Sequence, residues 1–218
     1  MLSWPDKDTV AGVSSTVIIV DDDRQVCDAL MSLLRSMDFT VCAFSSVAEL
    51  VRAGLPKGAA CLILDVRLPG RSGLEFQRDL VTANVRLPVI FITGHGDIPM
   101  SVQAMKGGAV EFLTKPFRDQ DLLDAVAIGL ARDRERLGRE ISDAALLDSV
   151  RKLSSRERQV MALLVEGRLN KQIAADLGIS EVTVKIHRRN LMGKLRASNL
   201  IDLARIADRL ERSTTTHQ

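Results

Sequence analysis

Between residue 16 and about residue 130, short apolar runs alternate with amphipathic stretches, and this alternation restricts the possible folds more than any other feature of the chain. Five runs have the length and apolar content of buried strands, at residues 17–20, 40–44, 60–64, 89–93 and 110–113. Helical patterns separate them at 25–37, 47–51, 73–82 and 99–106, and a fifth begins near Asp119. Strands that alternate with helices predict an α/β fold with a doubly wound, five-stranded parallel sheet.

Acidic residues stand where two of these strands should end. Asp21 and Asp22 follow the first run, and Asp65 follows the third. Right-handed crossovers place the first and third strands side by side, so these carboxylates should share the edge of the sheet where ligands collect in parallel α/β proteins. Carboxylates ~4 Å apart repel by about 4 kcal/mol per pair at an effective dielectric of ~20. A divalent cation would offset this repulsion, and we therefore expect Mg²⁺.

The charge of the chain is divided unevenly between its two ends. Residues 151–218 carry 14 lysines and arginines against 7 acids, or +7, whereas residues 1–150 carry 16 against 21, or −5. A basic domain behind an acidic one suggests that the second part meets a polyanion.

Composition narrows the class and the location. Hydrophobic residues make up 46% of the chain and charged residues 27%, as in ordinary globular proteins. The longest apolar runs are too short to cross a bilayer, and the first residues lack a basic segment followed by an apolar one, so we expect a cytoplasmic protein with no membrane partner. Three cysteines without paired spacing are expected to be free thiols.

Beyond residue 130 the chain is charged and helical, without strand signals. Leu123, Leu130, Leu137 and Ala144 recur at every seventh position, which is typical of a coiled-coil seam. The companion positions are partly polar, so a helical linker over residues 131–150 is favoured over a sustained coiled coil. Gly138 should weaken this helix near its middle.

Four short helices are expected in the C-terminal part, each with a start or stop signal. Ser154 and Glu157 have the spacing of a capping box and open a helix that ends at Gly167. We expect three more helices: 171–177, capped by Asn170; 181–194, capped by Ser180; and one that starts at Asn199 and runs to about residue 210. The second and third are separated by only three residues, beginning at Gly178, which predicts a helix-turn-helix unit.

The first part of the chain resembles the receiver domain of two-component response regulators, most closely their FixJ branch. The resemblance covers about residues 16–130 and rests on the acidic residues above and on Thr93-Gly94-His95-Gly96-Asp97-Ile98-Pro99-Met100 and Lys115-Pro116-Phe117. It implies a flavodoxin-like sheet with strand order 2-1-3-4-5.

The same resemblance implies a role for each site residue. Asp65 would accept a phosphoryl group from a kinase histidine. Mg²⁺ would be bound by Asp65, by Asp22 as a direct ligand, by Asp21 mainly through water, and by the backbone carbonyl of Arg67. Thr93 would hydrogen-bond the phosphoryl group. Lys115 would form an ion pair with it, and the Lys115–Pro116 peptide bond would be cis. Phe112 would be the aromatic residue that swings inward when Thr93 moves towards the phosphoryl group.

Two other functional classes are weighed against this prediction. A phosphohydrolase with an aspartyl nucleophile would need a general acid, and Asp65-Val66-Arg67 lacks a second acid two residues on. A metabolite sensor would need an organic ligand, whereas the acidic constellation suits a cation and a phosphoryl group better. We therefore do not expect an enzyme.

The helix expected over residues 181–194 has two faces. Val184, His187, Leu191 and Leu195 fall on one, and a second face with two cations is free to enter a major groove. Residues 153–210 resemble the LuxR-type helix-turn-helix through Leu153-Ser154-Ser155-Arg156-Glu157, Asn170-Lys171-Gln172-Ile173-Ala174 and Ser180-Glu181-Val182-Thr183-Val184-Lys185-Ile186-His187. By position, bases would be met by Lys185, Ile186 and Arg189, and phosphates by Asn170, Lys171, Thr183 and Arg188.

Together these features predict a phosphorylation-activated, DNA-binding transcriptional regulator. Its expected partners are a sensor histidine kinase, double-stranded DNA, a second copy of the chain on phosphorylation, and RNA polymerase. The predicted organisation is a flexible arm (1–15), a receiver domain (16–130), a helical linker (131–150), a LuxR-type helix-turn-helix domain (151–212) and a tail (213–218).

Overall fold

The computed structural model describes the backbone of residues 15–215 and the side chains of residues 15–210. This part of the chain forms five strands and nine helices, in two compact units that divide between Leu137 and Gly138. Residues 1–14 of the predicted arm and residues 216–218 of the predicted tail lie outside the described residues.

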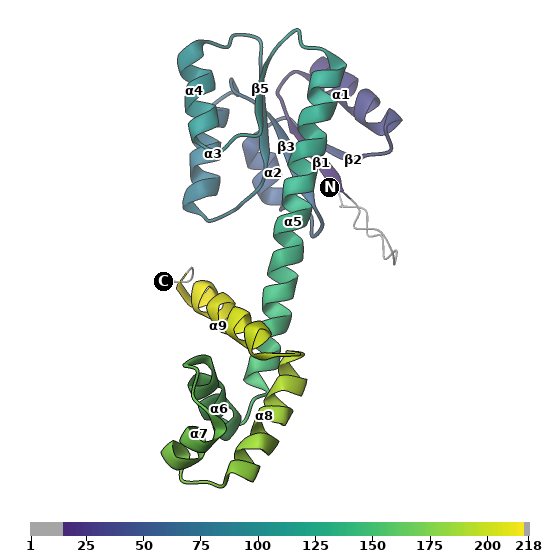
Figure 1. The fold of residues 1–218 in the computed structure, drawn as a ribbon. Coiled ribbons are helices and arrows are strands. Elements are labelled where there is room, and N and C mark those ends of the chain that lie inside the picture. Colours follow the sequence, from purple (N-terminus) through teal and green to yellow (C-terminus); the bar gives the residue numbers. More distant parts are fainter. Residues whose placement is uncertain (1–14, 216–218) are drawn as a thin grey trace. The chain divides into compact units, whose positions relative to one another are not determined.

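The first unit contains one parallel sheet in the order β2-β1-β3-β4-β5, which confirms the predicted α/β fold (Figure 1). Its strands are β1 (Thr16–Val20), β2 (Thr40–Phe44), β3 (Ala60–Asp65), β4 (Val89–Thr93) and β5 (Glu111–Thr114). The pairing of Val20 with Leu64 brings the ends of β1 and β3 together, as the crossover rule requires. β5 begins one residue later than predicted, which is within the ordinary uncertainty of strand boundaries.

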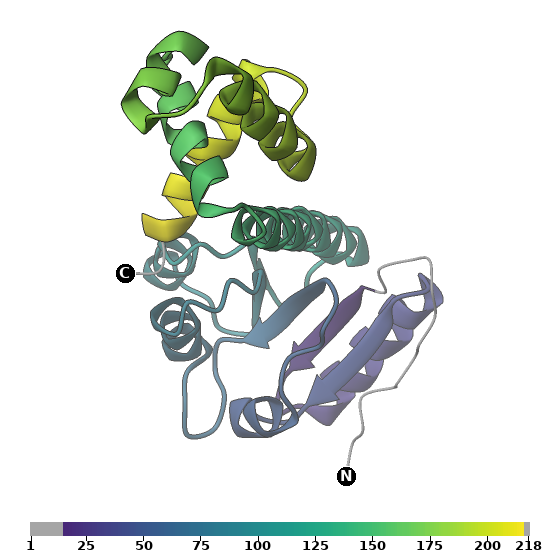
Figure 2. The same cartoon turned by 90° about the horizontal axis from the view of Figure 1, so that it is seen from below.

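Helices cover both faces of the sheet (Figure 1; Figure 2). α1 (Arg24–Ser36) and the first half of α5 (Asp119–Arg151) pack on one face, and α2 (Val47–Ala53), α3 (Gly73–Thr82) and α4 (Ile98–Lys106) pack on the other. α5 approaches β3 closely at Gly129, where an added Cβ would lie 2.6 Å from Cys61 Sγ. Further along α5, the buried Asp133 carboxylate accepts a hydrogen bond from the backbone N–H of Ala60 at 2.8 Å.

Residues 131–150 are helical, as expected of the linker. They belong to α5, which runs for 33 residues and continues through Gly138. The helix therefore stays continuous at Gly138, although a glycine in a helix interior costs about 1 kcal/mol relative to alanine.

The second unit contains α6 (Ser155–Val165), α7 (Asn170–Leu177), α8 (Glu181–Leu195) and α9 (Leu200–Thr215) around a single apolar core. The capping box of Ser154 and Glu157 is present, and Ser180 caps α8 as predicted. α7 ends at Gly178, which adopts a left-handed conformation with φ of 64°.

One predicted cap is wrong. Asn170 is the first residue of α7, and the N-cap is Leu169, whose side chain cannot accept a hydrogen bond. Gln172 supplies the missing partner instead, because its Oε1 accepts the N–H of Leu169 at 2.8 Å.

α9 extends the last predicted helix to Thr215, so the first residues of the expected tail are helical. Within the described residues, no helix is both long enough and apolar enough to cross a membrane.

Candidate functional site

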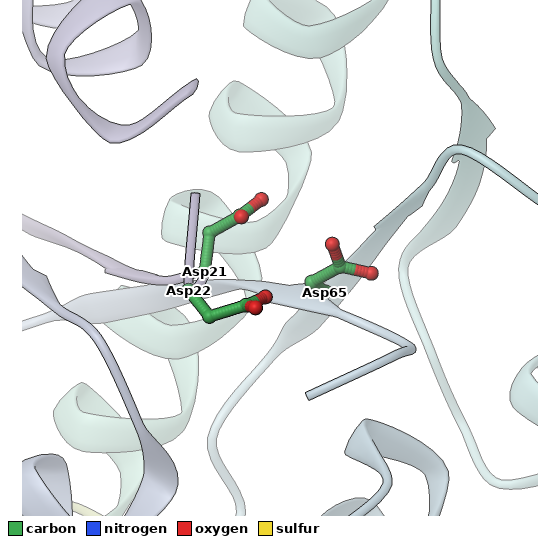
Figure 3. A group of neighbouring side chains, drawn as sticks. All are labelled: Asp21, Asp22 and Asp65. Atoms are coloured by element: carbon green, nitrogen blue, oxygen red, sulfur yellow. The ribbon is translucent and has the colours of Figure 1, made fainter. Parts of the chain in front are cut away.

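The carboxyl ends of β1 and β3 bring three carboxylates together (Figure 3). Asp21 and Asp22 follow β1, Asp65 ends β3, and each offers an oxygen within 4.8 Å of the others. Asp21 and Asp65 are buried, whereas Asp22 is exposed. The structure therefore places the three residues that were predicted to share an edge at one point of that edge.

Lys115 balances part of this negative charge. It follows β5, its bond to Pro116 is cis as predicted, and its Nζ donates to Asp21 Oδ2 at 2.6 Å and to Asp65 Oδ2 at 3.1 Å. Burial alone would lower the pKa of Lys115, but the hydrogen bonds to the two carboxylates outweigh it and the pKa is raised. Burial raises the pKa of Asp21, and the hydrogen bond from Lys115 offsets only part of that rise.

The remaining oxygens distinguish the three carboxylates. Asp21 Oδ1 accepts the N–H of Asp23 at 2.9 Å, and Asp65 Oδ1 accepts the N–H of Arg67 at 2.9 Å. In the described part of the chain, the Asp22 carboxylate makes no hydrogen bond or ion pair. Asp22 is thus the carboxylate whose oxygens are most available to a new ligand.

The donor set fits a hard divalent cation. Three carboxyl groups face a single ammonium, so the acidic groups outnumber the basic one, and carboxylate oxygens are the ligands that Mg²⁺ and Ca²⁺ prefer. The Arg67 guanidinium is a cation without a lone pair to donate to a metal, so only the backbone carbonyl of Arg67 can take part.

Thr93 ends β4 beside this cluster and is fully buried. Its Oγ1 accepts the N–H of His95 at 3.3 Å, which leaves its hydroxyl proton free to donate. Its carbonyl accepts the N–H of Lys115 at 2.8 Å, so Thr93 and Lys115 are held side by side.

Phe112 lies on β5 in contact with the loop that follows Thr93. The ring is half-buried, 6.3 Å between centroids from Phe91. A Cβ added to Gly96 would lie 2.9 Å from the Phe112 ring and 3.0 Å from Thr93 Cγ2. Gly96 therefore allows the loop to pack against both residues, a contact that sequence reasoning missed because only the absence of a side chain signals it.

The second predicted site lies on α7 and α8. Val184, Leu191 and Leu195 of α8 are buried in the core of their unit, and His187 is half-buried. The opposite face exposes Lys185, Ile186 and Arg189, the three residues expected to meet bases. Two cations beside an exposed apolar side chain suit guanine edges and a thymine methyl group.

The residues expected to meet phosphates differ in availability. Lys171 is exposed, whereas Asn170, Thr183 and Arg188 are half-buried. The Thr183 hydroxyl lies 2.8 Å from Ser180 Oγ, and Asn170 Oδ1 is buried without a partner. Of the two cations in this set, Lys171 on α7 is therefore more accessible than Arg188 on α8.

An ion pair that the sequence did not reveal positions α8. Glu157 is 4% exposed and accepts hydrogen bonds from Lys194 Nζ at 2.7 Å and from the N–H of Ser154 at 2.7 Å. Lys194 also donates to the carbonyl of Lys152. The hydrogen bond from Lys194, helped by that from Ser154, lowers the pKa of Glu157. The end of α8 is therefore fastened to the start of α6 by residues 37 positions apart.

Comparisons with known proteins match both units. Residues 17–127 match the response regulator receiver domain, and residues 151–207 match the luxR family of bacterial regulatory proteins. The chain is 50% identical over 202 residues to nodulation protein W of Bradyrhizobium diazoefficiens, covering 93% of this chain and 89% of that one. It is 43% identical over 194 residues to the transcriptional regulatory protein FixJ of Azorhizobium caulinodans, covering 89% and 92%.

Solved structures give the same picture. The response regulator StyR matches with a TM-score of 0.81 and 45% identity, covering 89% of this chain and 98% of that one. Full-length FixJ from B. japonicum matches with a TM-score of 0.54 and 38% identity, covering 91% and 98%.

Proposed function

The chain belongs to the two-component response regulators that join a receiver domain to a luxR-type DNA-binding domain, and from that premise we propose that Asp65 is its phosphoryl acceptor. The family implies a kinase partner for the first domain and DNA binding for the second. The observation that carries the proposal is the position of the buried Asp65 carboxylate, which lies beside the Asp21 and Asp22 carboxylates and accepts a hydrogen bond from the Lys115 ammonium.

The proposed reaction is an in-line displacement at phosphorus. An oxygen of Asp65 attacks the phosphorus of a kinase phosphohistidine, the O–P bond forms, the N–P bond breaks, and the imidazole nitrogen leaves with the electron pair. Lys115 offsets negative charge that the phosphoryl group brings beside Asp65, since its ammonium already lies 3.1 Å from that carboxylate. The hydroxyl of Thr93 can then donate to a phosphoryl oxygen.

We propose Asp22, Asp65, Asp21 and the Arg67 carbonyl as the protein groups that hold Mg²⁺. When bound, the ion would supply positive charge that offsets the negative charge of the Asp65 carboxylate and of the incoming phosphoryl group. Both oxygens of Asp21 and both oxygens of Asp65 already accept hydrogen bonds, and Asp21 is the less suited of the two to direct ligation because it is more deeply buried and makes the shorter contact with Lys115. This agrees with a role for Asp21 through water.

We propose that the hydroxyl of Thr93 couples phosphorylation of Asp65 to a change at the surface of the domain. A bond to the phosphoryl group would draw Thr93 and its loop toward Asp65, which would vacate space beside Gly96 for the Phe112 ring. We propose that this movement favours dimerisation through α4, β5 and α5. α4 presents exposed Ile98, Val102 and Met105 on its surface, which supports an apolar contact there.

On DNA, a dimer would place Lys185, Ile186 and Arg189 of each α8 in successive major grooves. Half-sites about one helical turn apart, ~34–36 Å, are expected. We propose that the DNA-bound dimer then acts on RNA polymerase. We also propose that the protein works in the cytoplasm.

The direct test is to incubate the full chain with Mg²⁺ and acetyl phosphate and to measure its intact mass. One added phosphoryl group is expected in the wild type, none in Asp65→Asn, and much less in Asp22→Asn or without Mg²⁺. Incorporation into Asp65→Asn at the wild-type level would contradict the assignment.

A further inference from the structure

The first unit contains a cavity at the opposite end of β4 from Thr93. Its volume is about 330 Å³, and it lies among the end of α3, the start of β4, the turn after α4 and the side of α5. β4 runs five residues from Val89 to Thr93, so roughly 13 Å of strand separates this cavity from the acidic cluster. The cavity is therefore distinct from the site of phosphoryl transfer.

Most of the cavity wall is apolar. The side chains of Leu80, Val85, Leu87, Pro88, Val89 and Val110 line it. A volume of this size lies at the lower end of the range of small-molecule sites, roughly 300–1,000 Å³, and suits one small organic molecule.

A buried amide also lines the cavity. Gln77 is 4% exposed, and its Nε2 donates to the carbonyl of Ala104 at 3.1 Å, which joins α3 to α4. Within residues 15–215, its Oε1 accepts no hydrogen bond. An added Cβ at Gly107 would lie 2.5 Å from this oxygen, so the glycine leaves room for the amide. Gln77 Oε1 can only accept a hydrogen bond, so it adds a polar point to the cavity wall and offers no bond to a carboxylate.

Two arginines border the same cavity without acidic partners. Arg86 precedes β4, Arg132 lies on α5, and neither side chain makes a hydrogen bond or ion pair in the described part of the chain. The acid next to Arg132, Asp133, is already held by Ala60 and Arg136. Two guanidinium groups that face one cavity would attract an anion, and their planar donors suit a carboxylate.

We propose that this cavity binds a small organic carboxylate with an apolar body, held by Arg86 and Arg132. The apolar walls select the body of the ligand, and the arginines select its charge. Inorganic phosphate lacks the first feature and a neutral amide lacks the second. Asp65 contributes nothing to the site.

The test is a titration of the ¹⁵N-labelled full chain with benzoate, phenylacetate and isovalerate, followed by amide chemical shifts. Benzamide and inorganic phosphate serve as comparison ligands. At least one carboxylate should give saturable shifts at residues 80–89 and 107–110, with Kd below about 1 mM. The same shifts are expected in Asp65→Asn, so the result does not depend on the proposed phosphoryl acceptor.

Arg86→Gln and Arg132→Gln should each weaken that carboxylate at least about tenfold, or about 1.4 kcal/mol. Arg78→Gln is the matched control, because Arg78 is exposed on α3 and does not line the cavity. The proposal is overturned by the absence of saturable shifts with every carboxylate, by equal affinity for benzamide or phosphate, or by an equal loss in Arg78→Gln.

Discussion

Replacing Lys115 with methionine removes the cation that balances part of the negative charge of the acidic cluster and keeps most of the side-chain volume. Its Nζ lies 2.6 Å from Asp21 Oδ2 and 3.1 Å from Asp65 Oδ2, and its side chain is only 22% exposed. Without it, carboxylates up to 4.8 Å apart repel by about 3.5 kcal/mol per pair at an effective dielectric of ~20. Partial protonation and solvent relieve some of this energy, so we expect Lys115→Met to destabilise the first unit by about 2–4 kcal/mol in Mg²⁺-free buffer at pH 8.

Hydrogen exchange of the β1 and β3 amides measures this stability for the first unit alone. Lys57→Met is the control, since Lys57 is an exposed residue with no ion pair in the described chain and its replacement changes the net charge equally. Mg²⁺ should bind Lys115→Met roughly tenfold more tightly than the wild type, because the ammonium no longer competes for the same oxygens. A stability equal to that of Lys57→Met, or weaker Mg²⁺ binding in Lys115→Met, would refute the reasoning.

Three further predictions concern other parts of the chain. Glu157→Gln should destabilise the second unit by about 1–3 kcal/mol near neutral pH. Because the folded-state pKa of Glu157 lies below its ordinary 4.5, the wild-type advantage should be complete above that pH and disappear as pH falls through the lowered value, which thermal unfolding across pH can check. Arg189→Ala should weaken binding to specific DNA by ~1–3 kcal/mol and relax the preference at one base. Lys171→Ala should weaken binding to all sequences alike and reduce its salt dependence. Equal losses of affinity for specific and random duplexes in both variants would count against these roles. Gly129→Ala should destabilise the first unit by about 1–3 kcal/mol despite a better helix propensity, and Cys61→Ala in the same chain should recover part of the loss, as denaturation of the two variants and their combination would reveal.

Much of the first unit could be predicted from the sequence because local pattern and topology agree there. Apolar runs with helical spacing between them imply a parallel sheet, and the crossover rule then places Asp21 and Asp65 at neighbouring strand ends. The reach of Lys115 past β4 to both carboxylates could not be derived in this way, because it depends on the path of the chain after β5. Only resemblance to a family suggested Lys115.

In the second unit, local signals were less complete. Ser154 and Ser180 cap helices as their positions suggest, but Asn170 does not, because it is already the first residue of α7. The N–H of Leu169 instead donates to the side chain of Gln172, which lies within the helix. The pair of Glu157 with Lys194 depends on how α6 and α8 pack, and no spacing rule connects residues so far apart.

The central claim is that a phosphoryl group on Asp65 controls the DNA affinity of α8. It is tested most directly by fluorescence anisotropy with a duplex selected from a random-sequence pool, before and after addition of Mg²⁺ and acetyl phosphate. We predict that the wild type binds at least about tenfold more tightly after phosphorylation and that Asp65→Asn does not respond. A wild-type chain that carries one phosphoryl group by mass and binds the duplex no more tightly than before would contradict the account.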